Sequence, residues 1–373
     1  MKIVIAMDSF KGTLSAFEVC DIIASVIREH LPAADCVLKP VADGGEGTAQ
    51  AMLKSIPGKW IPKKVTGPLF DMKVNAGFAW FEDSRTALVE MASAAGLQLL
   101  TKAQYNPMKT TTYGVGELIR AAGKYKPEKI LFAVGGSATV DGGTGAAEAI
   151  GWQFVDKDGK QIRGSGAGLK NIVKIIPPSK KLEIPVEVLC DVQNPLCGEF
   201  GAARIYGPQK GATPEMVEEL ESGLLHLGQL IREQLKCDVV DVPGAGAAGG
   251  LAAAALAFMN GKLVSGIDTI INCSNIETEL KDADWIVTGE GCFDRQSLFG
   301  KVVSGIAKIA RTAKIHMAVI AGQVRLPKHE YQKIGVATAL SCKPDDMDID
   351  EALSKSRMLL QLAAKKFVQE NLV

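Results

Sequence analysis

The chain has 373 residues, of which 47% are hydrophobic, and its 42 Lys and Arg residues balance its 42 Asp and Glu residues. This length allows a large core and two or three domains. Zero net charge and an aromatic content of 6% speak against nucleic acid or an anionic membrane surface as a partner. The eight cysteines form no C-x-x-C pair, so we expect reduced, mostly buried thiols in a cytoplasmic protein.

The pattern of predicted helices and strands changes within the first ninety-odd residues. Residues 2–8 (KIVIAMD) predict a strand, 15–31 an amphipathic helix and 36–43 a second strand. The opening apolar run is too short for a secretory signal, and no run reaches the 18 apolar residues of a membrane span. Residues 60–68, 73–82 and 86–94 then follow one another with short turns, which predicts antiparallel sheet.

From about residue 109 the strand–helix alternation resumes. KILFAVGG (129–136) and PVEVLCDV (185–192) read as buried strands, and 213–235 as a long helix capped by Thr213 with Pro214 at its first position. The last ninety residues contain the continuous apolar runs WIVTGE and MAVIAG, which are typical of parallel strands, and a terminal helix from about 348.

The two ends of the chain therefore resemble each other, and the middle differs. We predict an α/β fold with two domains and an active site in the cleft between them. The first is an open, Rossmann-like parallel sheet built from residues 1–62 and 282–373. The second is an inserted α/β domain with a mixed sheet, residues 63–281.

Five clusters of glycine and polar residues come directly after apolar strands. They are DSFKGT (8–13), ADGGEGT (42–48), GGSATVDGG (135–143), CDVQNP (190–195) and GEGCFDRQSLFGK (289–301). One such cluster alone could be a turn or a helix cap. Because open parallel sheets bind ligands at the carboxyl ends of their strands, five together indicate a binding site.

The residue types in these clusters favour phosphoryl transfer. That reaction uses backbone N–H groups around phosphates, a lysine, a divalent cation and a carboxylate that orients the attacking hydroxyl. The clusters supply lysines and carboxylates, and the chain has only four histidines, so hard oxygen ligands indicate Mg²⁺ and not zinc. The candidates are Asp8, Lys11, Asp43, Glu46, Asp141, Asp191, Glu290, Asp294 and Lys301.

Other functions would require sequence motifs of their own. No Walker A sequence and no G-x-S-x-G are present. PGAGAAGG contains one formal G-x-G-x-x-G (Gly244, Gly246, Gly249), so an NAD(P)-dependent oxidoreductase is the alternative, although the same residues suit close helix packing. A non-catalytic protein that binds a cation or a sugar is a third reading. The loop YGPQKGAT contains Lys210, which could touch phosphate or only lead into the following helix.

Taken in order, DSFKGTLSA, ADGGEGT, GGSATVDGG, CDVQNPLCG, YGPQKGA, GAGAAGG and TGEGCFDRQSLFGK resemble the sequence blocks of the glycerate kinases that form 2-phosphoglycerate, across almost the whole chain. Val140 stands where that family usually has Asn. The resemblance implies ATP and Mg²⁺ as cofactors, D-glycerate as the acceptor, and transfer of the γ-phosphoryl group. A homo-oligomer is compatible with it.

The resemblance and the loop chemistry together give a set of expected site residues. The catalytic set is Lys11, Asp43, Asp191 and Lys301, with Asp191 as the proton acceptor. ATP is expected to contact Gly135, Gly136, Ser137, Asp141, Gly142 and Gly143. Glycerate is expected to contact Asp8, Ser9, Lys11, Asn194, Arg295 and Gln296, and Mg²⁺ to be bound by Asp141, Glu290 and Asp294.

Overall fold

The computed structural model describes residues 1–42, 44–298 and 301–373, and the chain divides into two compact units. Unit 1 comprises Met1–Asp43, Gln50–Pro57 and Ser265–Val373, and unit 2 comprises Gly44–Ala49 and Gly58–Val264. One unit is therefore built from both chain ends and the other from the middle of the chain. Among the described residues, no helix has the length and apolar character needed to cross a membrane.

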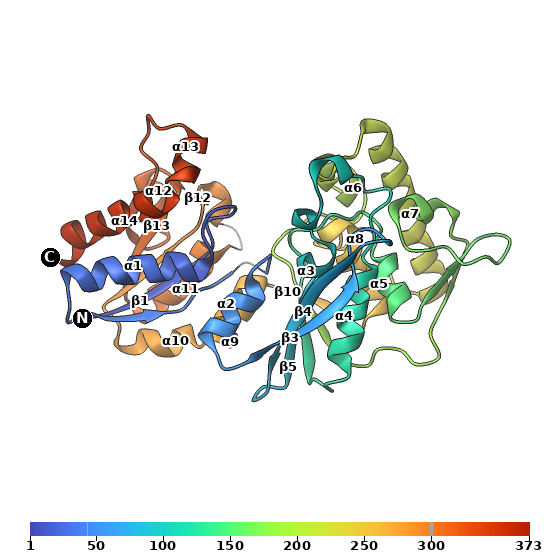
Figure 1. The fold of residues 1–373 in the computed structure, drawn as a ribbon, viewed down its shortest axis with the longest axis horizontal. Helices are drawn as coiled ribbons and strands as arrows, with labels where there is room; N and C mark the ends of the chain where they lie inside the picture. The colour runs from blue at the N-terminus through green and yellow to red at the C-terminus, as the bar shows by residue number, and fades with distance from the viewer. Residues whose placement is uncertain (43, 299–300) are drawn as a thin grey trace. The chain divides into compact units, whose positions relative to one another are not determined.

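Unit 1 contains a five-stranded sheet in which every neighbouring pair is parallel (Figure 1). Met7 pairs with Gly289, and Ala321 pairs with Ser341, so four adjacent strands end at one edge. In spatial order the strands are β15 (Val336–Ser341), β13 (His316–Ala321), β11 (Trp285–Gly289), β1 (Lys2–Met7) and β2 (Asp35–Leu38). A short parallel pair, β12 (Cys292–Phe293) and β14 (Gln323–Val324), follows β11 and β13 in the chain.

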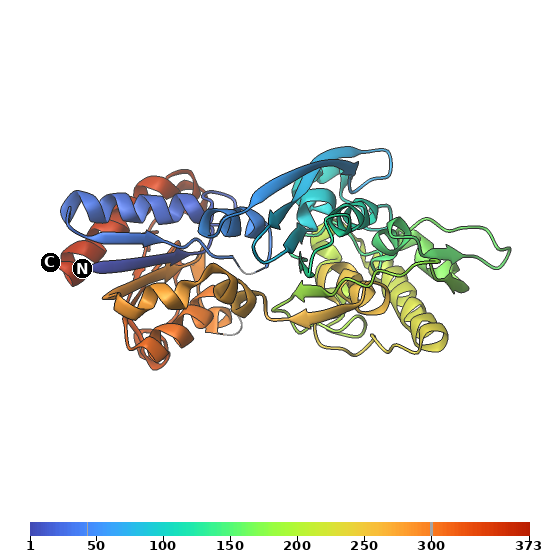
Figure 2. The same cartoon turned by 90° about the horizontal axis from the view of Figure 1, so that it is seen from below.

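Helices cover both faces of the unit 1 sheet. Alternate residues of β1 share a core cluster with α1 and α14, whereas α11 contacts β11 and packs on α9. Figure 2 shows α1 in blue on one face of this sheet and the orange helices on the other. The helices are α1 (Ala16–His30), α9 (Gly266–Ser274), α10 (Ile276–Glu279), α11 (Val302–Ala313), α12 (Lys328–Lys333), α13 (Ile349–Ser354) and α14 (Ser356–Phe367), while α2 (Thr48–Ser55) is shared between the two units.

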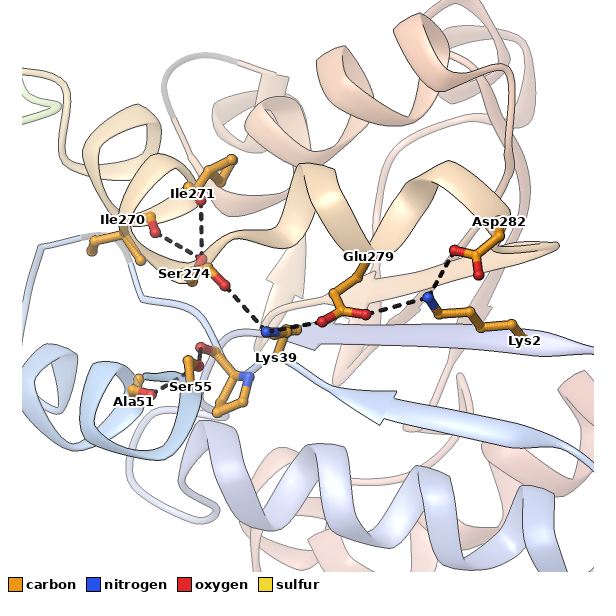
Figure 3. A network of polar contacts seen from close by, with 10 residues as sticks. Lys2, Lys39, Ala51, Ser55, Ile270, Ile271, Ser274, Glu279 and Asp282 are labelled. Carbon is orange, nitrogen blue, oxygen red and sulfur yellow. Dashed lines mark hydrogen bonds and ion pairs between the residues drawn. The ribbon is translucent and has the colours of Figure 1, made fainter. Parts of the chain in front are cut away.

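A polar network ties α9 and α10 to the first two strands of unit 1 (Figure 3). Lys39 Nζ donates to the backbone oxygen of Ser274 at 3.3 Å and lies 3.5 Å from a carboxylate oxygen of Glu279. Lys2 Nζ lies 3.2 Å from Glu279 and 2.9 Å from Asp282. Glu279 therefore lies between two lysines, one beside β2 and one in β1.

This network explains one difference between the expected and the observed division of the chain. We expected the inserted domain to span residues 63–281, whereas unit 2 ends at Val264, because α9 packs on α11 and the network links α9 and α10 to unit 1. At its other end, unit 2 takes up Gly58 and the whole of β3 (Lys59–Thr66), because β3 pairs along its full length with β4.

Unit 2 contains a six-stranded mixed sheet, as the sequence predicted. Strands β10, β9, β6 and β5 are parallel, and β5, β4 and β3 are antiparallel. The order is β10 (Gly261–Val264), β9 (Val186–Leu189), β6 (Lys129–Ala133), β5 (Thr86–Glu90), β4 (Lys73–Phe81) and β3 (Lys59–Thr66). A separate antiparallel pair is formed by β7 (Gln153–Val155) and β8 (Lys174–Ile176).

The helices of unit 2 share one large core with its sheet. They are α3 (Ala92–Ala95), α4 (Tyr113–Gly123), α5 (Thr144–Ala149), α6 (Ala202–Tyr206), α7 (Pro214–Leu235) and α8 (Ala247–Phe258). The predicted cap of the long helix α7 is confirmed, because the side chain of Thr213 accepts a hydrogen bond from Met216 N and Pro214 occupies the first turn.

Candidate functional site

A pocket of about 490 Å³ lies in unit 1 where four adjacent parallel strands end. The first residues beyond β1, β11, β13 and β15 are Asp8, Glu290, Gly322 and Cys342, and all four line this pocket. The loops hold each other by backbone bonds, with Asp8 N donating to Gly289 O at 2.9 Å and Gly322 N to Glu290 O at 3.1 Å. The sheet therefore places two of the five predicted clusters in one pocket.

The polar side of this pocket carries charges of both signs. Its cationic side chains are Lys11, Lys301, Arg325 and Lys343, and its carboxylates are Asp8, Glu290 and Asp294. Lys301 Nζ lies 3.8 Å from Glu290 Oε2, and the side chain of Glu290 is 11% exposed. Cations beside buried carboxylates give a site that could bind an anion and a metal ion together.

Another part of the pocket lining is apolar. It is lined by Ile349, Ala352, Leu353 and Leu359 of α13 and α14. This division into polar and apolar walls is typical of small-molecule sites, in which a few polar groups orient a ligand against apolar surface.

Two predicted residues on the 294–296 turn behave differently from their neighbours. Asp294 Oδ1 accepts from Gln296 N at 2.8 Å, so this carboxylate partly serves as a turn cap. Arg295 is not among the residues that line the pocket. Its guanidinium donates to both carboxylate oxygens of Glu330, and its side chain is 79% exposed. The expectation that Arg295 binds substrate is therefore not supported, because its guanidinium pairs with Glu330 of α12.

The polar loops of unit 2 also emerge at one edge of a sheet. In the parallel part, Glu90 pairs with Ala133, Ala133 with Leu189, and Leu189 with Val264. The residues that follow these positions therefore leave the sheet side by side. Two more of the predicted clusters, 135–143 and 190–195, begin here.

Segment 44–49, from a further cluster, lies against the same edge. A Cβ built on Gly135 would lie 2.6 Å from Gly45 Cα, and one on Gly44 would lie 2.9 Å from Leu189 Cβ. Glu90 Oε1 accepts from Ala49 N at 2.6 Å. Burial raises the pKa of Glu90 to about 7, against the opposing effect of the backbone hydrogen bonds from this segment. Glycines 44, 45 and 135 thus allow two backbones to approach closely.

Loop 135–143 has an accessible half and a buried half. Gly135, Gly136 and Ser137 are partly or fully exposed, and Gly136 has φ +77°. Gly142 and Gly143 are buried, and a Cβ on Gly142 would lie 2.5 Å from Leu227 Cδ2. The last two glycines therefore serve packing against α7 and α8, and the expected contact with a nucleotide does not fit them.

Asp141 is fully buried in the same loop. Its Oδ2 accepts from Thr112 N at 2.8 Å, Thr112 Oγ1 at 2.7 Å and Gly145 N at 3.3 Å, and its Oδ1 accepts from Gly143 N at 3.0 Å. Burial raises the pKa of Asp141, and these hydrogen bonds oppose that effect. A carboxylate that is 0% exposed and bonded to four protein donors does not fit a metal ligand or a contact to ATP, so both expected roles are corrected to a structural one.

The residue before this aspartate is Val140, whose side chain lies in the core of unit 2. The side chain of Val140 therefore packs in the core and does not contact a ligand.

Asp191 and Asn194 follow β9 at the carboxyl edge of the unit 2 sheet. Asp191 is half-buried, so its carboxylate is accessible in part. Asn194 donates from Nδ2 to Phe200 O at 2.8 Å and accepts from Tyr206 OH at 2.7 Å. The amide of Asn194 is therefore bonded to its own loop and to α6, which does not favour the expected contact to a substrate.

The GAGAAGG segment is buried, in contrast to a dinucleotide-binding loop. Ala248, Gly249 and Gly250 have positive φ values of 54°, 67° and 89°. A Cβ on Gly249 would overlap Thr139 O, and one on Gly250 would lie 2.9 Å from Gly142 Cα. These glycines allow α8 to pack on loop 135–143, and the oxidoreductase alternative has no support.

Two carboxylates of the unit 1 pocket, Glu290 and Asp294, fit a magnesium ion that arrives with a nucleotide. Mg²⁺ in such sites takes one or two protein carboxylates, and phosphates and water supply the other ligands. The part of the chain that the structure describes contains no group of three or more His, Cys, Asp or Glu side chains arranged around a metal. Asp43, expected in the catalytic set, lies outside the described residues.

Some residues of both sites were missed or left open by sequence reasoning. Arg325 and Lys343 follow β13 and β15 by a few residues, and Glu90 is the last residue of the apolar strand TALVE. The signal for all three is a charged residue at the carboxyl end of a buried strand. Lys210, which the sequence left undecided, has a fully buried side chain behind loop 135–143.

These features define a two-unit α/β protein with a mixed-charge small-molecule pocket at the carboxyl edge of a parallel sheet. The model of the glycerate kinase family matches residues 3–371. A glycerate kinase of Halalkalibacterium halodurans is 40% identical over 97% of this chain and 96% of its own length. The glycerate 2-kinase of Escherichia coli K12 is 45% identical over 86% of this chain and 84% of its own length.

A solved structure agrees with these sequence matches. A crystal structure from Salmonella typhimurium LT2, described as a candidate glycerate kinase 2, superposes with a TM-score of 0.84 at 41% identity and covers 99% of this chain and 97% of its own. The chain therefore belongs to the glycerate kinase family. The resemblance seen in its sequence blocks is confirmed, and so is the predicted α/β fold with one parallel and one mixed sheet.

Proposed function

We propose that the protein transfers the γ-phosphoryl group of MgATP to D-glycerate and forms 2-phosphoglycerate and ADP. The family and the relatives named glycerate kinase support a kinase, and the relative named glycerate 2-kinase supports the 2-phosphate as the product. The observation that carries the proposal at the site is the unit 1 pocket, where Lys11 and Lys301 lie with Asp8, Glu290 and Asp294 at the carboxyl ends of parallel strands.

In unit 1, the cationic side chains of the pocket are assigned to anion binding. Lys11 and Ser9 are in position to bind the carboxylate of glycerate, since both belong to the loop that leaves β1 and both line the pocket. Asp8 and Gln296, which also line it, are assigned to its hydroxyl groups. Lys301 lies close to Glu290. It is assigned to the transferred phosphoryl group, because an ammonium group stabilises the negative charge of that group.

In unit 2, the accessible half of loop 135–143 is assigned to the phosphate chain of ATP. Gly135, Gly136 and Ser137 are accessible at least in part, and their backbone N–H groups are assigned to the phosphate oxygens. Asp191 is assigned as the carboxylate that accepts the proton of the glycerate hydroxyl. It is half-buried and lies two residues beyond the end of β9, at the carboxyl edge of the sheet.

When bound, magnesium would supply charge neutralisation on the phosphate oxygens, and Glu290 and Asp294 are the residues assigned to hold it. The chain's own residues do the remaining work. They position the hydroxyl, hold the anionic oxygens and accept one proton, which is what phosphoryl transfer requires of a protein.

The test is an assay of the purified protein with ATP, Mg²⁺ and D-glycerate. ADP release should depend on both glycerate and Mg²⁺, and ³¹P NMR should show the phosphate on the 2-hydroxyl. Phosphate on the 3-hydroxyl would overturn the assigned product only. No ADP release with D-glycerate, together with release with another small hydroxy acid, would overturn the acceptor.

A further inference from the structure

Lys210 has a side chain that no ligand can reach but that contacts the loop assigned to phosphate. The residue is 2% exposed. Its Nζ donates to Ser137 Oγ at 2.7 Å and to Thr139 O at 2.7 Å. Burial lowers the pKa of Lys210 to about 7, and the nearby charge of Asp141 opposes that effect and favours the ammonium form. The centre of the Tyr206 ring lies 5.8 Å from Nζ. Lys210 therefore joins two residues of loop 135–143 from its buried side.

The direction of the bond to Ser137 has a chemical consequence. In its ammonium form Lys210 carries three N–H donors and no acceptor, so Ser137 Oγ accepts the hydrogen bond from Nζ. The hydroxyl hydrogen of Ser137 is then directed away from Lys210. No protein acceptor for it is found among the residues that the structure describes, and Ser137 is only half-buried.

The neighbours of Ser137 leave space for an incoming anion. Gly135 and Gly136 precede it and carry no side chain, and Gly136 is exposed. A hydroxyl whose acceptor side is occupied by a buried lysine is preorganised as a donor, and a donor held before binding loses less entropy when the ligand arrives.

We propose that Lys210 is a positioning residue that holds Ser137 as an outward hydrogen-bond donor to an anionic oxygen of the nucleotide's phosphate chain. This rests on the proposed function, because it is ATP that supplies the anionic oxygen. Lys210 acts only through Ser137 and Thr139 and does not touch the ligand.

The experiment is a double-mutant cycle with Ser137→Ala, Lys210→Met and the double variant. Binding of the Mg²⁺ complex of AMP-PNP is measured by calorimetry, and KM for ATP and for D-glycerate by steady-state kinetics. Each single variant should weaken AMP-PNP binding about tenfold, the size expected for a hydrogen bond to a charged group. The double variant should bind AMP-PNP no more weakly than Ser137→Ala alone, because Lys210 acts through the hydroxyl that Ser137→Ala already removes. KM for D-glycerate should stay unchanged.

Three outcomes would overturn the proposal. They are normal AMP-PNP binding by Ser137→Ala, additive losses in the double variant, and a rise in KM for glycerate in place of KM for ATP. If Lys210→Met does not fold, the test rests on Ser137→Ala. In that variant Lys210 keeps its bond to Thr139 O, so the buried side of the loop stays supported.

The matched control is Lys129→Met, which removes a lysine from the strand that leads into this loop. Lys129 pairs with Glu187 at 2.7 Å and its side chain is 35% exposed, so AMP-PNP binding should not change. A wild-type protein that binds AMP-PNP but does not phosphorylate glycerate would refute the acceptor and leave the role of Lys210 standing. A wild-type protein that does not bind AMP-PNP would refute both.

Discussion

The two units use the same kind of sequence in opposite ways. In unit 1, the loops after parallel strands surround an open pocket, and lysines and carboxylates line it. In unit 2, the loops after parallel strands pack against each other and against helices. The polar side chains there form their hydrogen bonds with other protein groups, as Asp141, Asn194 and Lys210 do. A glycine–aspartate cluster after a strand therefore indicates a carboxyl edge, but does not tell whether the aspartate faces a ligand.

The difference follows from what covers each edge. Segment 44–49 and the glycine-rich start of α8 approach loop 135–143 closely, so most of that loop is removed from solvent. In unit 1, side chains of α13 and α14 line the pocket together with the loops, and a volume of about 490 Å³ remains. Four predictions test this contrast.

Asp191 is the residue of the unit 2 edge for which we expect the largest effect on turnover. Asp191→Asn keeps the shape of the side chain but removes its charge. If Asp191 is the base, kcat should fall about 10²–10⁴-fold, the usual contribution of a general base, with AMP-PNP binding unchanged. Asp158→Asn, on an exposed turn of the same unit, is the control. Loss of thermal stability with normal turnover of the folded fraction would show that Asp191 is structural.

Asp141 should act on stability and not on metal binding. In Asp141→Asn the amide would direct an N–H group at one of the four donors that now bond to the carboxylate. We expect unit 2 to lose about 2–4 kcal/mol, the cost of a disrupted buried hydrogen-bond network. The measurement is urea unfolding, and the dependence of turnover on Mg²⁺ should not shift in the folded protein. An unchanged unfolding midpoint would contradict the buried network.

Glu90 should make the stability of the protein depend on pH. Its pKa is raised from 4.5 to about 7 in the folded state, so the folded state holds this proton more tightly than the unfolded chain. The stabilisation from the proton is complete below about pH 4.5 and is lost as pH rises through about 7, and it is worth at most roughly 3 kcal/mol.

This contribution can be isolated by comparing Glu90→Gln with wild type in urea unfolding at several pH values. The variant should lose the decline in stability between about pH 4.5 and 7 that wild type shows. Glu82→Gln is the control, because the side chain of Glu82 is 79% exposed. Equal slopes for Glu90→Gln and wild type would show that folding does not raise the pKa of Glu90.

Lys11 and Arg295 give the smallest and most direct test of the unit 1 pocket. Lys11→Met should raise KM for D-glycerate about 10–100-fold, the size of a hydrogen bond to a charged group. Arg295→Met removes a guanidinium that pairs with Glu330 outside the pocket lining, so KM should change by less than about twofold, as for an exposed ion pair. The reverse order of effects would restore Arg295 as a substrate ligand.

Much of the fold could be predicted because it depends on local patterns. Continuous apolar runs such as MAVIAG predicted parallel strands, and the short-turn region 60–94 predicted the antiparallel part of the second sheet. The capped helix α7 follows from Thr213 and Pro214 alone. The unit boundary at Val264 could not be predicted in this way, because it depends on ion pairs between Glu279 and two lysines near the start of the chain.

The sequence by itself determined the fold class, the strand-end position of the polar clusters and the family, because apolar periodicity and ordered motifs are written along the chain. Only the tertiary structure decided that Asp141 and Gly142 are buried while Ser137 is accessible, that Arg295 turns to Glu330, and that Lys210 lies behind Ser137. Residues 137 and 210 are far apart in the chain, so their contact depends on how α6, α7 and the loop after β6 pack. Side-chain direction and burial are properties of that packing, and a linear motif does not contain them.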